Sequence, residues 1–165
     1  MRPLTNAPTW FPNHRNANWI APDPDPRVHE FHRGLDGYAP TALTELPLIA
    51  AELGVARFFA KDESHRLGLP AFKALGASWA IHRFLDDHAE SGASEAGPFT
   101  LVTASDGNHG RAVARFARRS GHAATILVPH GVHVRAIEAI QAEGAQVVQV
   151  DGNYDDAVHA AAEMA

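Results

Sequence analysis

Cysteine is absent from the 165-residue chain. This absence excludes disulfide bonds, thiolate metal sites and a cysteine nucleophile. Lysine is scarce as well, because only Lys61 and Lys73 occur among the 14 basic residues. Any chemistry that requires a side-chain amine therefore has two candidates.

Long apolar runs and an excess of positive charge are also missing. No apolar run approaches about 18 residues, so we expect no membrane span. The first residues lack the apolar core of a secretory signal, so we expect a cytoplasmic protein. The chain has 14 Lys and Arg against 19 Asp and Glu, a net charge of −5. This balance argues against a nucleic-acid partner.

Proline is concentrated at the start of the chain, with seven of the eleven prolines in the first 40 residues. Each proline fixes φ and disfavours helix at the preceding residue. We therefore predict an extended N-terminal arm over residues 1–42, with one short helix near residues 26–33. The aromatic residues of the arm suggest that it packs on the rest of the chain; they are Trp10, Phe11, Trp19, Phe31 and Tyr38.

From residue 43 onward, short apolar segments alternate with segments of helical periodicity. We predict helices over residues 43–53, 71–88, 108–120 and 134–143, strands over residues 55–61, 99–103, 123–128 and 145–150, and a last helix from about residue 154. This alternation predicts an α/β fold with a parallel sheet covered on both faces. Helical periodicity still runs at Ala165 without a closing strand. We therefore expect residues 43–165 to be a partial domain, truncated at the C-terminus.

Lys73 lies in GLPAFKALGAS, at the start of a predicted helix. The first turn of a helix has unpaired N–H groups and a partial positive charge. With Phe72, Leu69 and Leu75 nearby, this environment favours the uncharged amine, which Schiff-base chemistry requires. The alternative interpretation is an ordinary surface lysine at a helix end.

A second candidate site is the SDGNHG turn at residues 105–110, between a predicted strand and a predicted helix. Its two glycines allow a ligand close to the backbone, and the following helix N-terminus favours anionic groups. Asp106 and Asn108 would lie at the carboxyl end of a parallel strand, where α/β proteins bind ligands. The alternative is a helix N-cap with an Asx turn. The pattern is neither GxGxxG nor a Walker loop, so it gives no support to a nucleotide site.

The other polar residues have simpler interpretations. The eleven histidines lack metal-ligand spacing, since the closest pair is His130 and His133, and we interpret them as scattered surface residues without a metal. One set of arginines is interpreted as a solvated basic helix face without a partner. These residues are Arg111, Arg115, Arg118 and Arg119.

Taken together, KDESHRLGLPAFKALGAS and ASDGNHG resemble the pyridoxal-phosphate (PLP) enzymes of fold type II, the tryptophan-synthase-β-like superfamily. The resemblance implies a parallel-sheet, three-layer α/β fold, of which the chain holds the N-terminal part. It also implies that Lys73 forms the Schiff base with the cofactor and that Asn108 hydrogen-bonds its 3′-oxygen. Phe72, Gly107 and His109 would flank the cofactor.

The segments FHRGLDGYAPTAL, SDGNHGRAVA, ILVPHGV and DGNYDDAV are similar to the diaminopropionate ammonia-lyase branch, from about residue 31 to the end. Threonine and serine dehydratases usually have serine where Ala71 stands, and they lack an acid at the position of Asp106. One departure from the ammonia-lyases is Ala42, where the family usually has proline.

This resemblance implies elimination of ammonia from 2,3-diaminopropionate, with pyruvate and a second ammonia as products. Lys73 and Asp106 would be the catalytic acid–base groups, the substrate a small amino acid, and the full-length protein a homodimer without a nucleic-acid or membrane partner. In the family, the glycine-rich phosphate cradle and a second acid come later than any segment of this chain. We therefore expect the chain to be catalytically incomplete.

Two alternatives stay open. The first is a PLP-dependent lyase that acts on serine or threonine, which an Asp106→Ser substitution would distinguish by its effect on substrate preference. The second is an inactive fragment that acts at most as an interaction module.

Overall fold

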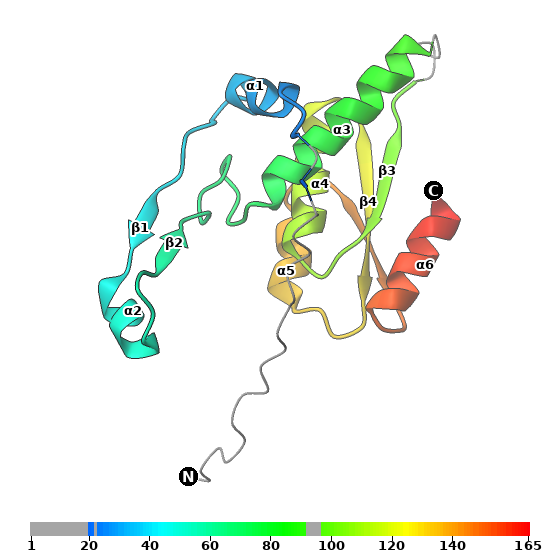
Figure 1. Ribbon diagram of the computed structural model, residues 1–165. Helices are drawn as coiled ribbons and strands as arrows, with labels where there is room; N and C mark the ends of the chain where they lie inside the picture. The colour runs from blue at the N-terminus through cyan, green and yellow to red at the C-terminus, as the bar shows by residue number, and fades with distance from the viewer. Residues whose placement is uncertain (1–19, 22, 92–96) are drawn as a thin grey trace.

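The computed structural model describes residues 20–21, 23–91 and 97–165. Its centre is a parallel sheet with the strand order β3-β4-β5, as Figure 1 shows. The strands are β3 (Thr100–Ala104), β4 (Ala123–Pro129) and β5 (Gln146–Val150), and the helices that follow β3, β4 and β5 are α4 (Asn108–Arg119), α5 (Val134–Gln141) and α6 (Tyr154–Met164). The predicted α/β fold is confirmed, and these bounds lie within about two residues of the predicted ones.

The sheet is covered on both faces, which makes three layers. Alternate side chains of β4 face opposite ways, so Ile126 and Val128 pack with α4 and α5, whereas Leu127 packs with α6. All three side chains are buried. A strand that is buried on both faces reads as a continuous apolar run, and this explains the ILV sequence of β4.

Helix α4 packs very close to the sheet because of one glycine. A Cβ atom on Gly110 would lie 2.6 Å from Ile126 Cγ2 and 2.9 Å from Ser105 Cβ. Ala114 and Ala117 continue the same buried helix face with small side chains. The helix that begins at the candidate site is thus seated firmly on the strands.

The helix predicted over residues 43–53 and the strand predicted over residues 55–61 both begin later in the structure. Residues 43–45 form strand β1 (Leu43–Glu45), which pairs antiparallel with β2 (Phe59–Lys61), and this pair is a separate two-stranded sheet. Helix α2 (Pro47–Leu53) begins only at Pro47, because proline lacks the N–H that a helix interior uses but fits its first turn. Gly54, with a φ of 66°, ends it as predicted.

The N-terminal arm includes helix α1 (Arg27–Gly34), the short helix predicted there. It packs on α3 (Lys73–Glu90) through Phe31, whose ring stacks on His82 at 4.3 Å between centroids. His32, predicted to be a surface residue, is instead buried and donates from Nε2 to the Leu75 carbonyl at 2.9 Å. The aromatic residues Trp10, Phe11 and Trp19 lie outside the described residues.

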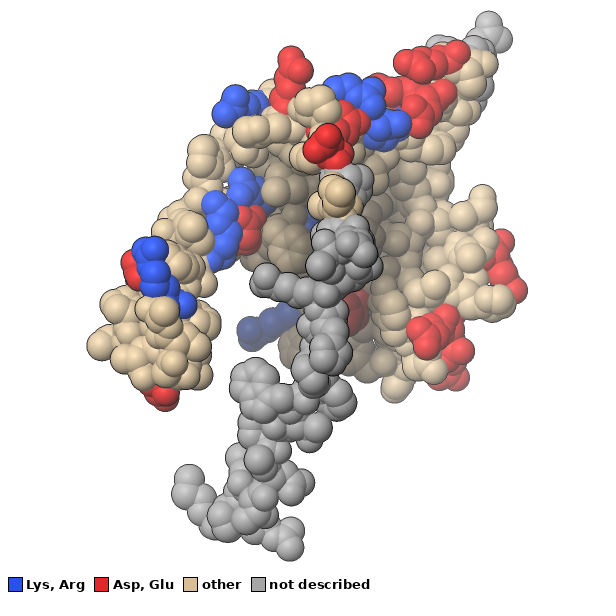
Figure 2. Space-filling view, in the orientation of Figure 1, with Lys and Arg blue, Asp and Glu red and all other residues tan. Residues whose placement is uncertain are grey.

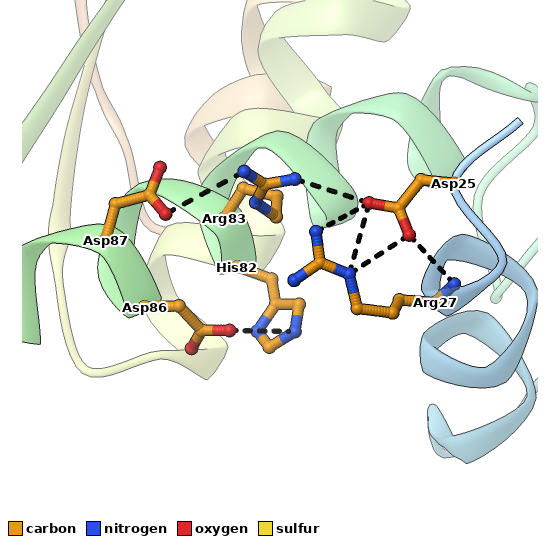
Figure 3. Close-up of polar contacts among 6 residues, drawn as sticks. All are labelled: Asp25, Arg27, His82, Arg83, Asp86 and Asp87. Atoms are coloured by element: carbon orange, nitrogen blue, oxygen red, sulfur yellow. Dashed lines mark hydrogen bonds and ion pairs between the residues drawn. The ribbon is translucent and has the colours of Figure 1, made fainter. Parts of the chain in front are cut away.

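Charged side chains reinforce this contact at the surface. Asp25 accepts hydrogen bonds from Arg27 and also contacts Arg83 of α3 at 3.4 Å, as Figure 3 shows. Such exposed pairs add little to stability, because solvent screens them. Figure 2 shows basic and acidic side chains intermixed over α1 and α3, and only acidic ones around α6. This face therefore presents no basic stripe.

The predicted solvated arginine face of α4 is wrong for Arg111 and Arg115, whose side chains are mostly covered, whereas Arg118 and Arg119 are exposed. Arg111, Arg115 and Arg118 converge on Glu143, a residue of the α5–β5 connection whose side chain is buried. Burial raises the pKa of Glu143, but hydrogen bonds from Arg115 and Arg111 outweigh it and hold that pKa below its ordinary value. The arginines are therefore structural partners of a buried carboxylate.

Candidate active site

Lys73 is the first residue of α3, directly after the helix N-cap residue Phe72. Its Nζ atom lies 5.1 Å from the centre of the Phe72 ring, and both side chains are exposed. The other lysine is engaged elsewhere, since Lys61 Nζ donates to the Thr41 carbonyl at 2.6 Å. Of the two amines, Lys73 is thus the one at a helix N-terminus.

The turn between β3 and α4 is organised by Ser105, which is buried. Its hydroxyl accepts hydrogen bonds from the amides of Gly107 at 3.1 Å and Gly110 at 2.8 Å. Its own amide donates to the Leu127 carbonyl at 2.9 Å and so continues the pairing with β4. The oxygen that supports the first turn of α4 therefore comes from Ser105, and the alternative of an Asx cap by Asp106 or Asn108 is wrong.

These two segments line one hollow of about 540 Å³. Its lining residues are Lys73, Ser105, Asp106, Asn108, His109 and Tyr154. A volume of this size is typical of sites for small ligands. The structure therefore brings together Lys73, Asp106, Asn108 and His109 of the predicted site. Phe72 and Gly107 are adjacent in sequence but do not belong to the described lining.

His109 is half-buried beside Lys73. Burial lowers the pKa of the imidazole below its ordinary value, and the positive charge of Lys73 lowers it further. At a given pH, the lowered pKa leaves the ring of His109 neutral more often than that of an ordinary histidine. His109 can offer one ring nitrogen as a donor and the other as an acceptor without adding charge to the site.

Tyr154 is a lining residue that the sequence analysis missed. It is the first residue of α6, and the capping box of Asn153 and Asp156 fixes the start of that helix. Tyr154 also lines a second, more apolar hollow between β3 and α6, which it shares with His109. Its position directly after β5 is a signal that could have identified it, because α/β ligands bind outside the carboxyl ends of strands.

The donor set fits the reactive end of PLP. An amine suits its aldehyde carbon, and the carboxamide of Asn108 can donate to a ring oxygen.

In the described part of the chain, no group of three or more His, Cys, Asp or Glu side chains could hold a metal ion. Among the same residues, no helix is both long and apolar enough to cross a membrane.

Sequence comparisons identify relatives with the same combination of segments. Residues 35–165 match the family model for pyridoxal-phosphate dependent enzymes. Diaminopropionate ammonia-lyase of Escherichia coli K12 is 38% identical over 143 residues, which cover 79% of this chain and 35% of the relative. For the Salmonella typhimurium enzyme the identity is 38% over 152 residues, or 84% of this chain and 38% of the relative. The chain thus spans little more than a third of these relatives.

Solved structures agree with this similarity. The Escherichia coli enzyme in complex with an aminoacrylate-PLP azomethine reaction intermediate matches with a TM-score of 0.75 and 38% identity, over 83% of this chain and 36% of that one. A threonine deaminase from Solanum lycopersicum matches less closely, with a TM-score of 0.58 and 26% identity over 76% of this chain and 34% of that one. From the matched segments and the parallel α/β sheet, we conclude that the chain belongs to the pyridoxal-phosphate dependent enzyme family and has its type II fold.

Proposed function

We propose that the chain carries the lysine-bearing part of a PLP-dependent lyase that eliminates ammonia from 2,3-diaminopropionate. The observation that carries the proposal is the common hollow of Lys73, Asp106 and Asn108. The higher identity to diaminopropionate ammonia-lyases than to threonine deaminase supports this substrate over a hydroxy amino acid.

The proposed cofactor contacts follow from the donor set. Lys73 would hold the aldehyde carbon through Nζ, and Asn108 would donate to the ring oxygen. Phe72, Gly107 and His109 would flank the ring. When bound, PLP supplies a carbonyl that condenses with amines and a ring that withdraws electrons from the substrate α-carbon.

Lys73 and Asp106 are the proposed proton carriers. An Asp106 carboxylate oxygen would accept the α-proton, and the Lys73 amine would move a proton at Nζ once the substrate amine has displaced it. The β-amine leaves as ammonia only after it gains a proton, so an acid close to the substrate serves this step as well. Hydrolysis of the remaining enamine consumes one water and yields pyruvate and the second ammonia.

The test compares substrates and one substitution. Chain incubated with PLP is supplied with the D- and L-isomers of 2,3-diaminopropionate, serine and threonine, and oxo-acid and ammonia are measured. Turnover should be slow, because the chain carries only the lysine-bearing part of the site. Among these amino acids diaminopropionate should give pyruvate first, and Asp106→Asn should lose about 10²–10⁴-fold of that rate, the usual contribution of a general acid or base. The matched control is Glu163→Gln on the exposed end of α6, which should not change the rate.

Other outcomes point to the alternatives. Faster turnover of serine or threonine, with no effect of Asp106→Ser on substrate preference, would assign a dehydratase-like lyase. No product from any of these amino acids, together with no capture of PLP, would contradict the proposal for this chain and favour an interaction module.

The proposal includes two further expectations for the whole protein, namely a cytoplasmic location and a homodimer. The first comes from the sequence analysis, and the second comes from the family resemblance. Light scattering on the purified protein measures the mass directly, and a monomer at working concentration would contradict the second expectation.

A further inference from the structure

The segment that leads into Lys73 contains a tight turn with an unusual backbone. Leu67 has a φ of 53°, the only positive value at a non-glycine residue in the described part of the chain, and Gly68 follows with 73°. The Leu69 amide closes the turn by donating to the Arg66 carbonyl at 2.9 Å. A leucine adopts this conformation at an energetic cost, so it persists only where surrounding contacts hold it.

Arg115 supplies such a contact from α4. Its Nη1 atom donates to the Leu67 carbonyl at 3.1 Å. The same atom lies 3.1 Å from the place that a Cβ on Gly68 would occupy. The guanidinium is therefore packed directly against the turn, and the Leu67 side chain is buried in the main core.

Glu143 fixes the other edge of this guanidinium. Arg115 donates from Nε to Oε2 at 2.9 Å and from Nη2 to Oε1 at 2.6 Å, which is a bidentate pair. The Glu143 side chain is only 5% exposed, and Arg111 donates to it as well. With two nitrogens held by the carboxylate, Nη1 is aimed at the Leu67 carbonyl.

Helix α4 carries both Arg115 and Asn108 of the candidate site. Helix α4 begins at Asn108 in the candidate site, and Arg115 lies about two turns further along. The turn at residues 66–69 ends four residues before Lys73. Arg115 thus links the segment that carries the lysine to the helix that carries Asn108.

We propose that Arg115, clamped by Glu143, is a positioning residue that sets the location of Lys73 relative to Asn108. The role of Arg115 in placing Lys73 for catalysis rests on the proposed function. Its stabilisation of the turn at residues 66–69 does not.

The test uses two variants and one control. Arg115→Gln removes the guanidinium, and Glu143→Gln keeps the shape of the carboxylate side chain but removes the charge that holds Arg115. Arg119→Gln removes the same charge from the same helix at a residue that packs over the Phe116 ring. Hydrogen exchange is followed in peptides 66–73 and 154–164, and PLP is fixed by borohydride to compare labelling of Lys73 with that of Lys61.

We expect exchange in peptide 66–73 to rise about tenfold or more in Arg115→Gln, the usual effect of losing a hydrogen bond to a charged group. Glu143→Gln should give a smaller rise, peptide 154–164 should be unchanged, and the preference for Lys73 should fall in both variants. Arg119→Gln should behave as the wild type.

Three results would overturn the inference: unchanged exchange in peptide 66–73, a uniform rise in both peptides, or a loosened turn with undiminished preference for Lys73. If the wild type itself captures no PLP, the proposed function fails, and the exchange data alone still decide whether Arg115 holds the turn.

Discussion

At the scale of single residues, Lys73 and His109 line the same hollow and are electrostatically coupled. Burial and the Lys73 charge both lower the pKa of His109. Because its folded pKa lies below its unfolded value of 6.5, the stability linked to His109 is present above pH 6.5 and declines as the pH falls toward the folded pKa.

Lys73→Gln should therefore raise the NMR titration midpoint of His109 toward its ordinary value, because the charge is lost while burial remains. Lys61→Gln is the matched control, since that amine is bonded to the Thr41 carbonyl. A His109 midpoint that is identical in wild type and Lys73→Gln would show that the two side chains are not neighbours.

At the scale of elements, the close packing of α4 on the sheet depends on Gly110. Gly110→Ala would place a methyl group within 2.6 Å of Ile126 Cγ2 and should lower the free energy of unfolding by about 1–3 kcal/mol. Gly76→Ala, on α3 with open space around its Cβ position, should instead stabilise by about 0.5–1 kcal/mol. Denaturant unfolding measures both, and equal effects would contradict this packing.

The segment between α1 and the Lys73 turn is held by a second arginine–carboxylate pair. Arg66 donates to both oxygens of Glu63, and also to Thr41 Oγ1 at 2.7 Å. The hydrogen bonds from Arg66 lower the pKa of Glu63 to about 2, against the opposing effect of burial.

This shift makes a prediction about acid stability. The contribution of the Glu63 carboxylate is present above pH 4.5 and is lost as the pH falls from there toward 2. Glu63→Gln should be less stable than the wild type at pH 7, and its free energy of unfolding should fall less between pH 5 and pH 3. Parallel curves of free energy against pH for the two proteins would mean that Arg66 does not lower the pKa of Glu63.

The sequence predicted some helices and strands and not others. The βα units after residue 99 were predictable because each has its own apolar period and turn residues. Strand β1 was hidden because its three residues continue the helical spacing of α2, and its pairing with β2 is a contact between distant segments. Arg115 and Glu143 are 28 residues apart, so no local pattern reveals that they meet.

At the scale of the whole molecule, the candidate site lies at the carboxyl edge of the parallel sheet, where the N-terminus of α3 meets the connections that follow β3 and β5. Lys73, the β3–α4 turn and Tyr154 contribute to one hollow from separate segments. Lys73 and the turn were predictable because a known family carries both motifs, whereas Tyr154 depended on knowing where α6 begins. The roles proposed for these residues remain predictions.

The central claim is that Lys73 is the amine that holds PLP. The most direct measurement is titration of the purified chain with PLP, followed by borohydride reduction and peptide mass mapping of the two lysines. If Lys73 holds PLP, the labelling saturates and is selective for Lys73 over Lys61. Labelling that is weak, or equal on both lysines, would contradict it.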